Sequence, residues 1–219
     1  MIQTILVPQG AEYQAVCRGL SRFPGSQSKV IAVPLGMQAL RQFLKKNCQH
    51  LNQLNQQVLL MGLCGSLNER YSIGDIVLYQ DCIYQGKLQK CDSILNKSIH
   101  KQLGDKVSFV KGVTSDRVIS LAEEKRNLHQ QFGADVVDME GFATLEFFQR
   151  LGVSVAILRV VSDDSLHDIP DLTSVITADG SLPPLPLAWK LIRQPLAAIR
   201  LIRGSLQGLK VLETIASCF

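Results

Sequence analysis

Apolar residues in this chain form short runs, and longer segments with helical spacing separate many of these runs. The short runs predict strands at Ile2–Val7, Val30–Val33, Val58–Met61, Ile76–Tyr84, Val107–Val113, Asp135–Met139 and Val153–Val161. Apolar positions with helical periodicity predict helices over 11–21, 37–49, 121–132 and 140–151. Because the strand runs are almost continuously apolar, we expect an α/β fold whose central sheet is covered on both faces.

The alternation of strands and helices continues without an internal repeat or a long linker to about residue 168. We therefore expect one domain over residues 1–180, followed by a helical tail over residues 181–219. The first ten residues, MIQTILVPQG, lack a basic start and predict a strand rather than a signal peptide. No apolar run approaches the roughly 18 residues that a membrane-spanning helix needs.

The composition is 46% hydrophobic and 19% charged over 219 residues, which excludes a disordered or collagen-like chain. The six cysteines include no C-x-x-C pair and no companion histidine with zinc-ligand spacing, so we expect no metal site. They are typical of buried thiols in a reducing cytoplasm.

The net charge of +4 is unevenly distributed along the chain. Residues 1–180 have no net charge, because the whole excess comes from the tail, where a single acidic residue, Glu213, accompanies Lys190, Arg193, Arg200, Arg203 and Lys210. No basic stripe spans the domain, and aromatic residues make up only 6% of the chain. This distribution argues against nucleic-acid binding.

Three segments at predicted strand ends carry candidate chemistry. The first is Met61–Ser66, which follows a buried strand and contains Gly62, Leu63, Cys64 and Gly65. Two glycines there let a backbone approach a ligand closely, and they are equally typical of a tight turn without a ligand. The pattern is neither G-x-G-x-x-G nor a P-loop, so it does not indicate a nucleoside triphosphate.

The second segment, Val136–Ala143, ends a strand in Asp138, Met139 and Glu140 and continues at once as a helix. Carboxylates at a helix start commonly act as caps, and this interpretation stays open for Asp138. Glu140 differs, because a carboxylate can bind both hydroxyls of a diol while the Met139 thioether packs on a sugar. The pair therefore predicts a sugar site.

The third segment, Ile157–Asp164, is an apolar strand that contains Arg159 and ends in Ser162 and Asp163. A charge within a buried strand is costly unless it is paired or faces a site. A pocket can raise the pKa of a carboxyl group from its ordinary value of about 4, which makes a strand-end aspartate a candidate general acid. A structural cap with an internal ion pair is the alternative.

In this order, the three segments resemble the purine and uridine phosphorylase/nucleosidase superfamily, which includes the methylthioadenosine/S-adenosylhomocysteine nucleosidases. The resemblance covers about residues 2–170 and rests on V-L-L-M-G-L-C-G, S-I-G-D-I-V, V-D-M-E-G-F-A and L-R-V-V-S-D-D. It implies a three-layer αβα phosphorylase/hydrolase-like fold with a mixed, largely parallel central sheet. It also implies a homo-oligomeric enzyme that cleaves the N-glycosidic bond of a purine nucleoside.

The resemblance also implies roles for the residues of the second and third segments. Asp163 is the general acid that protonates the purine ring nitrogen, and Ser162 supports it. Protonation makes the base a better leaving group while the ribose develops positive charge. Glu140 holds the ribose hydroxyls, and Met139 packs on the ribose.

The attacking group is phosphate or water, and both stay open. The resemblance implies that Arg159 orients this group and that Glu12 lies near an attacking water in nucleosidases. Phosphate-using members commonly have Ser or Thr where Leu63 stands, so a water-using nucleosidase is an alternative, as is a non-catalytic nucleoside-binding module. Val118 and Ile119 match the loop that sandwiches the base. No cofactor is expected besides phosphate as a co-substrate.

The tail combines Trp189 and many Leu and Ile residues with basic residues on one broad arc of a helix, and a break is expected before Pro195. It predicts a docked helix pair with its basic face outward, an amphipathic element on an anionic membrane surface, or a partner-binding helix. With S-D-D-S-L-H-D-I-P, the tail resembles the hopanoid-associated phosphorylase branch. That resemblance implies a lipid-linked adenosine such as adenosylhopane, and a cytoplasmic enzyme peripheral on the inner face of the membrane.

Overall fold

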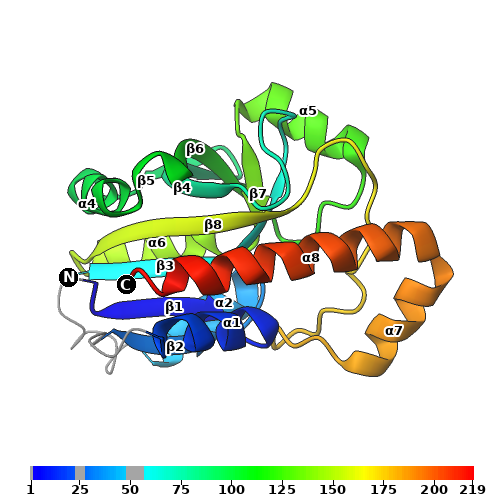
Figure 1. The fold of residues 1–219 in the computed structure, drawn as a ribbon, viewed down its shortest axis with the longest axis horizontal. Coiled ribbons are helices and arrows are strands. Elements are labelled where there is room, and N and C mark those ends of the chain that lie inside the picture. Colours follow the sequence, from blue (N-terminus) through cyan, green and yellow to red (C-terminus); the bar gives the residue numbers. More distant parts are fainter. Residues whose placement is uncertain (1, 23–27, 48–56) are drawn as a thin grey trace.

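The computed structural model describes residues 2–22, 28–47 and 57–219, and within them eight strands form one sheet (Figure 1). The strands are β1 (Thr4–Pro8), β2 (Lys29–Val33), β3 (Gln57–Ser66), β4 (Ile76–Tyr84), β5 (Lys87–Lys90), β6 (Val107–Thr114), β7 (Val136–Asp138) and β8 (Ser154–Asp163). Seven follow the order β2-β1-β3-β7-β6-β4-β5, and β8 pairs with β3 and β4. Five strand pairs are parallel and three are antiparallel, so the sheet is mixed and largely parallel as expected.

Helices cover both faces of this sheet, which confirms the three-layer α/β fold. They are α1 (Ala11–Leu20), α2 (Met37–Lys46), α4 (Ser93–Leu103), α5 (Ala122–Phe132), α6 (Gly141–Arg150), α7 (Pro184–Arg193) and α8 (Pro195–Ala216), with a 3-10 turn, η1, at Gly104–Lys106. Buried side chains of α1, α4 and α8 share one apolar core with the sheet, and those of α2 and α6 share a second. A smaller cluster lies beside α5 at the ends of β6 and β7.

Strand β8 explains why an almost continuously apolar run can form a strand. Leu158 and Val160 lie in the core shared with α1, α4 and α8, whereas Ile157 and Val161 lie in the core shared with α2. Successive side chains of a strand point to opposite faces, so a strand with helices on both sides buries every position. Arg159 lies among these residues and has no exposed surface.

Two regions differ from the sequence prediction. β3 does not end before the glycines but continues to Ser66, because Gly62 and the two residues after it pair with residues 159–161 of β8. The apolar pattern does not predict β5 and α4, since β5 is a polar, mostly exposed hairpin strand and α4 buries only one narrow face. Residues 48–49, at the end of the predicted second helix, lie outside the described residues.

The cysteines are only partly buried, which corrects the expectation from composition. Cys64, Cys82 and Cys91 are buried thiols in or beside the sheet. Cys218 is exposed because it follows the last turn of α8, and Cys17 is half-buried at the edge of α1. The five cysteines that the structure describes are all free.

Helix α8 crosses one face of the sheet along the length of the molecule and is anchored by its inner side (Figure 1). Its buried residues are Ala198, Gly204, Gly208, Leu212, Ile215 and Ala216. A Cβ atom at Gly204 would lie 2.1 Å from the carbonyl oxygen of Ser162, so the helix backbone rests directly on the end of β8. Near its other end, Glu213 pairs with Arg18 of α1 and with Arg22, which follows that helix.

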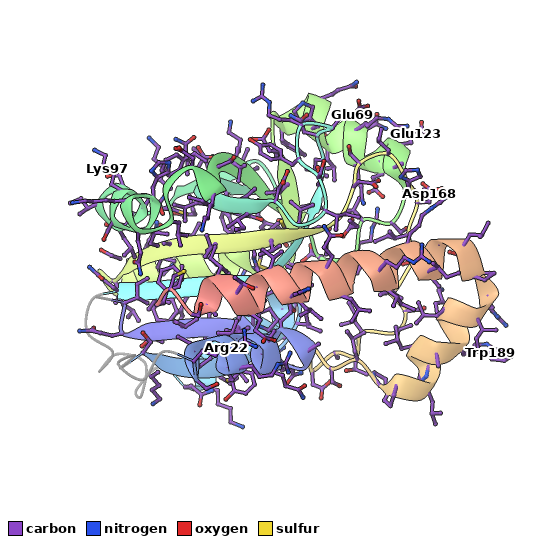
Figure 2. The ribbon with its side chains drawn as sticks, viewed as in Figure 1. Arg22, Glu69, Lys97, Glu123, Asp168 and Trp189 are labelled. Carbon is purple, nitrogen blue, oxygen red and sulfur yellow. The ribbon has the colours of Figure 1, made fainter. Side chains whose placement is uncertain are left out.

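The first half of α8 and all of α7 project beyond the sheet, at the end toward which β8 points (Figure 1). No residue of α7 is buried. We define the outer face of the tail by its exposed large apolar residues, Leu182, Leu185, Trp189, Ile192, Leu196, Ile199, Ile202 and Leu206. Trp189 is 62% exposed and lies at the outer edge of the molecule (Figure 2). In the described part of the chain, no helix is both long and apolar enough to cross a membrane.

The outer face of the tail also carries charge, since Arg193, Arg200 and Arg203 are exposed on the same two helices. The docked-helix interpretation therefore describes the second half of α8, whereas apolar and basic side chains both face solvent on the first half. The boundary between residues 180 and 181 stays a prediction.

Candidate active site

A cavity of about 200 Å³ opens where β3, β7 and β8 end, and it collects most of the predicted site residues. Its lining includes Glu12, Leu63, Cys64, Gly65, Val118, Ile119, Asp138, Met139, Glu140, Ser162 and Asp163. Gly62 and Arg159 do not line it. The remaining lining residues were not predicted from the sequence; they are Leu35, Arg117, Val137, Ile169, Leu172 and Leu201. The carboxyl ends of parallel strands are the usual ligand edge of such a sheet.

Arg159 lies behind the cavity wall and joins two carboxylates. Its Nη2 donates to Asp138 Oδ2 at 2.8 Å and to Glu140 Oε2 at 3.1 Å. Glu140 Oε1 accepts from the backbone N–H of Gly36 at 2.8 Å, so both oxygens of this carboxylate are held in place. Nε and Nη1 of Arg159 have no hydrogen-bond partner among the described residues. Unpaired donors of a buried charged group are costly.

Glu12, in the first turn of α1, reaches the same group of charges. Its Oε1 accepts from the backbone N–H of Leu63 at 2.5 Å. A Cβ atom at residue 62 would lie 2.2 Å from Arg159 Nη1 and 2.8 Å from Glu12 Oε1. The absence of a side chain at Gly62 therefore leaves room for Arg159 and Glu12. The sequence had instead suggested that this glycine contacts a ligand.

The environment of these groups shifts their pKa values. Burial raises the pKa of Glu12 to about 7, against the opposing charge of Arg159. Burial, reinforced by Asp138 and opposed by Arg159, also raises the pKa of Glu140 above its ordinary value. Burial opposes the charge of Arg159, but Asp138 and Glu140 outweigh it and raise the pKa of the guanidinium. With a pKa of about 7, Glu12 can exchange a proton near neutral pH.

Asp138 makes the contacts of a structural anchor. Its Oδ1 accepts from Thr114 Oγ1 at 2.7 Å, and its Oδ2 accepts from Arg159. The backbone N–H of Gly141, at the start of α6, donates to Asp138 Oδ2 at 3.1 Å. The cap interpretation of Asp138 fits these contacts, because the carboxylate takes up a free N–H of the first helical turn.

Asp163 has a hydrogen-bond donor on each oxygen. Ser162 Oγ donates to Oδ1 at 2.9 Å, which agrees with its expected supporting position. Lys125 Nζ, from α5, donates to Oδ2 and also to the backbone oxygen of Asp164 at 2.6 Å. The Lys125 side chain has no exposed surface. Lys125 was not predicted as a site residue, because E-E-K-R on an amphipathic helix is typical of a solvated face.

Apolar side chains complete the cavity on the side of α5 and α8. Val118 and Ile119 line it from the segment between β6 and α5, and Leu201 lines it from α8. The backbone N–H of Ile169 donates to Ser120 O at 2.9 Å, which joins the segment after β8 to the segment before α5.

The geometry therefore combines a fixed carboxylate suited to a diol, a carboxylate that titrates near neutral pH, and an aspartate paired with an ammonium group. Among residues 2–22, 28–47 and 57–219, no three His, Cys, Asp or Glu side chains are grouped to hold a metal ion. Acid–base groups around an apolar cavity suit the cleavage of a bond between a sugar and a base. The fold and this group of residues agree with the expected class of nucleoside phosphorylases and nucleosidases.

The chain belongs to the phosphorylase superfamily, whose sequence profile matches residues 47–178. Membership confirms the expected superfamily and an enzyme that cleaves the N-glycosidic bond of a nucleoside. No curated protein matches the chain in sequence.

Solved structures of nucleosidases share the fold at low sequence identity. The 5′-methylthioadenosine/S-adenosylhomocysteine nucleosidase of Helicobacter pylori is 16% identical, with a TM-score of 0.70 over 98% of this chain and 96% of that chain. Futalosine hydrolase of Helicobacter pylori is 15% identical, with a TM-score of 0.71 over 100% and 97%. The methylthioadenosine/S-adenosylhomocysteine nucleosidase of Campylobacter jejuni is 18% identical, with a TM-score of 0.62 over 97% and 99%.

Proposed function

We propose that this protein cleaves adenine from an adenosine whose 5′ position carries a long apolar group, as in adenosylhopane, with phosphate as the attacking group. The observation that supports the apolar substituent is the position of the tail beside the cavity, because Leu201 of α8 is part of the cavity lining. Ile169 lines the cavity and also a neighbouring hollow of about 450 Å³, whose other wall includes Leu196 and Ala197 of α8. Leu196 is 72% exposed and belongs to the outer face of the tail. The lining of this hollow also includes Asp168, Asp171 and Arg200, so we propose that an apolar substituent leaves the cavity beside Leu201 of α8, toward the outer face of the tail.

The polar end of the cavity supports the assignment of roles. Both oxygens of Glu140 are held by protein donors, and each keeps a lone pair for a ribose hydroxyl. Met139 lines the cavity beside it and packs on the ribose. Asp163 gives a proton to the leaving purine, and Val118 and Ile119 pack on the base.

Two observations support phosphate. Nε and Nη1 of Arg159 lack protein acceptors, and a phosphate oxygen is a strong acceptor for a guanidinium. With a pKa of about 7, Glu12 is about half protonated at neutral pH and mostly neutral below it, and its neutral form does not repel an anion. In this reading Glu12 is an additional donor to phosphate.

A second candidate is hydrolysis by water, and the position of Glu12 favours it. Glu12 lines the cavity whereas Arg159 does not. A carboxylate with a pKa of about 7 is well suited to take a proton from water near neutral pH. Hydrolysis of methylthioadenosine or S-adenosylhomocysteine would then be the activity.

The test is adenine release from adenosine, methylthioadenosine and a lipid-linked adenosine, each with and without phosphate. We expect release that needs phosphate and is fastest with the lipid-linked substrate. Release from methylthioadenosine without phosphate would overturn the proposal in favour of the nucleosidase. Adenine binding without turnover under every condition would favour a non-catalytic nucleoside-binding module.

We further propose that the outer face of the tail lies on an anionic membrane at the inner surface of the cell. Its exposed Leu, Ile and Trp residues can enter the interface, while Arg193, Arg200 and Arg203 meet anionic headgroups. Deleting the tail is a poor test, because the second half of α8 belongs to the core.

Substitution on α7 tests the membrane contact without disturbing the core. The triple change Leu185→Ser, Trp189→Ser and Ile192→Ser should abolish sedimentation with phosphatidylglycerol vesicles, whereas Ile94→Ser on α4 should not. Ile94 is a suitable control because it is 78% exposed and far along the chain from the tail. Equal sedimentation of the triple variant and the wild type would refute the contact.

The superfamily resemblance also leads us to propose a homo-oligomer. Light scattering on the eluting protein measures its mass directly. A single species at the 24.2 kDa of one chain would refute this part of the proposal.

A further inference from the structure

Lys125 is a buried cation to which the proposed reaction has so far given no role. Its side chain has no exposed surface, and its ammonium group donates to the carboxylate of Asp163 and to the backbone oxygen of Asp164. Removing an ammonium from water is costly unless its partners compensate. A lysine in this place therefore needs a reason beyond the general packing of α5.

Attachment of α5 is not that reason, because other contacts already join it to the segment after β8. The backbone N–H of Ala122 donates to Asp168 Oδ1 at 2.7 Å. Arg126 Nη1 donates to the backbone oxygen of Ser165 at 3.3 Å. These contacts connect the same two segments at less buried positions, without a charge beside the cavity.

The contacts of Asp163 set the chemical requirement. Lys125 forms an ion pair with one oxygen of Asp163, and Ser162 Oγ lies 2.9 Å from the other oxygen and 3.2 Å from Cys64 O, so in this arrangement Asp163 is a carboxylate. A carboxylate in this state has no proton for a leaving base. A general acid at Asp163 therefore needs a proton from a neighbour, and the ammonium of Lys125 is the donor that already contacts it.

We propose that Lys125 is a positioning residue that acts through Asp163, holding its carboxyl group at the cavity and supplying the proton that Asp163 passes to the departing purine. This inference rests on the proposed nucleoside cleavage. As the glycosidic C–N bond breaks, its electron pair goes to the purine, which takes a proton from Asp163. Lys125 Nζ gives one proton to Asp163, so the purine leaves neutral, the carboxylate is restored and Lys125 becomes a neutral amine. Phosphate or water captures the ribosyl cation, and solvent later returns a proton to Lys125.

The choice of lysine over arginine fits this role. A lysine amine loses its proton readily when buried, whereas a guanidinium keeps its proton in proteins. Arg159 has a guanidinium, which keeps its proton, and it binds Asp138 and Glu140 rather than Asp163. The two cations of the site thus differ in the property that proton supply requires.

Other titratable groups near the pair come from three elements. On β3, burial raises the pKa of the Cys64 thiol well above its ordinary value. After β8, hydrogen bonds from His167 outweigh burial and lower the pKa of Asp164. On α5, Arg126 is the charged neighbour in sequence. All of these remain in a Lys125 variant, so the ratio of variant to wild-type turnover isolates the lysine.

The first test is the pH profile of adenine release by Lys125→Met, using the adenosine substrate that the wild type cleaves. At neutral and alkaline pH we expect a loss of at least about 10²-fold, the usual scale for general acid catalysis. The loss should shrink as the pH falls, because Asp163 then takes its proton from solvent. Arg126→Met, which removes a charge one residue away, should leave turnover unchanged. A constant ratio of variant to wild type across pH would overturn the proposal.

A second variant separates proton supply from folding and positioning. Lys125→Arg keeps a positive charge on Asp163 but does not release its proton, so we expect a folded protein with low turnover at neutral pH. Full turnover of Lys125→Arg would overturn proton supply. Melting curves of both variants report whether the fold is intact.

A double variant tests whether Lys125 acts through Asp163. In the Asp163→Asn background, Lys125→Met should cause no further loss of turnover, because the shared path is already broken. A further loss as large as in the wild-type background would overturn the proposal. A wild type without turnover on every substrate overturns the proposed function itself, and with it the step assigned to Lys125. Normal wild-type turnover with a constant pH ratio overturns only the role of Lys125.

Discussion

Two buried cations pair with carboxylates that line the cavity, and they differ in what they can do with a proton. Arg159 on β8 binds Asp138 and Glu140, and its guanidinium stays charged. Lys125 on α5 binds Asp163, and an ammonium can give its proton away. The two buried cations therefore have different roles. One cation fixes a framework of carboxylates, and the other keeps a proton beside the candidate acid.

Removal of the guanidinium should have the largest effect. Arg159→Met leaves Asp138 and Glu140 buried without their cation, and breaking a buried pair in this way costs about 3–5 kcal/mol. We expect the free energy of unfolding, measured by urea denaturation, to fall by about that amount, and nucleoside cleavage to be lost. Arg41→Met is the control, because Arg41 and Glu146 form a partly exposed pair, which contributes at most about 1 kcal/mol. Equal losses in both variants would contradict the framework role.

Asp163→Asn comes next and tests the other cation. Turnover should fall at least about 10²-fold, since the candidate acid is removed. The variant also leaves Lys125 without its carboxylate, and a buried lysine can shed its proton. Its loss of stability relative to the wild type should therefore shrink as the pH rises.

Two measurements check Asp163→Asn, namely turnover at saturating substrate and urea denaturation at neutral and alkaline pH. Turnover near that of the wild type would remove Asp163 from the acid role. A loss of stability that does not change with pH would mean that Lys125 behaves like Arg159, and the contrast between the two cations would fail.

Glu140→Gln should have a smaller effect, on binding rather than on the fold. A hydrogen bond to a charged group contributes about 1.5–3 kcal/mol, so we expect KM to rise about tenfold or more. The variant should also lose the preference for ribose over 2′-deoxyribose in parallel. Steady-state kinetics with the two sugars measures both quantities. If the two effects vary independently, Glu140 does not bind the diol.

Glu12→Gln should have the smallest effect when phosphate attacks. The neutral form of Glu12 is then the competent one, so wild-type turnover falls as the pH rises through about 7, and the variant removes its share of this fall. When water attacks, Glu12 is the base, turnover rises through the same pH and the variant is inactive. The pH profiles of both proteins, with and without phosphate, distinguish the two mechanisms.

The same variant makes a prediction for stability. The folded-state pKa of Glu12 is about 7, above the ordinary value of 4.5, so its contribution to stability is lost as the pH rises through that range. Glu12→Gln should be about as stable as the wild type at acidic pH and more stable above neutral pH. Melting temperatures at the two pH values measure this difference, and an equal difference at both would contradict the raised pKa.

The fold was largely predictable because most of its strands are visible in the sequence as short, nearly continuous apolar runs. β8 and the neighbouring β3 are apolar at nearly every position, which is the signature of burial on both faces. The apolar pattern does not predict β5, because this polar hairpin strand lies at the sheet edge and buries no apolar face. The end of β3 was also missed, since Gly62 and Gly65 are typical of a turn but are here strand residues.

Site residues were predictable from the sequence where a carboxylate stands near the end of an apolar strand. They were not predictable where tertiary packing brings a residue from another element into contact with such a carboxylate. Glu140 and Asp163 directly follow apolar runs, so sequence alone indicates the edge at which they meet. Lys125 lies in a charged stretch of an amphipathic helix, and only the packing of α5 against the segment after β8 brings it to Asp163. The need for Gly62 likewise depends on Arg159 and Glu12, which lie far from it in the sequence.

The contact at Gly204 has a consequence for how this protein can change during evolution or by design. Only a hydrogen atom fits between that position of α8 and the carbonyl of Ser162, so nearly every substitution there would disturb the strand that ends in Asp163. Two residues further on, Leu206 is exposed, so we expect substitutions there to leave the fold intact. We therefore expect the exposed side of α8 to accept many more substitutions than its buried side. Substitutions on the exposed side could adapt the protein to a different surface in the cell. The buried side is constrained, because it packs on the end of the strand that carries Asp163.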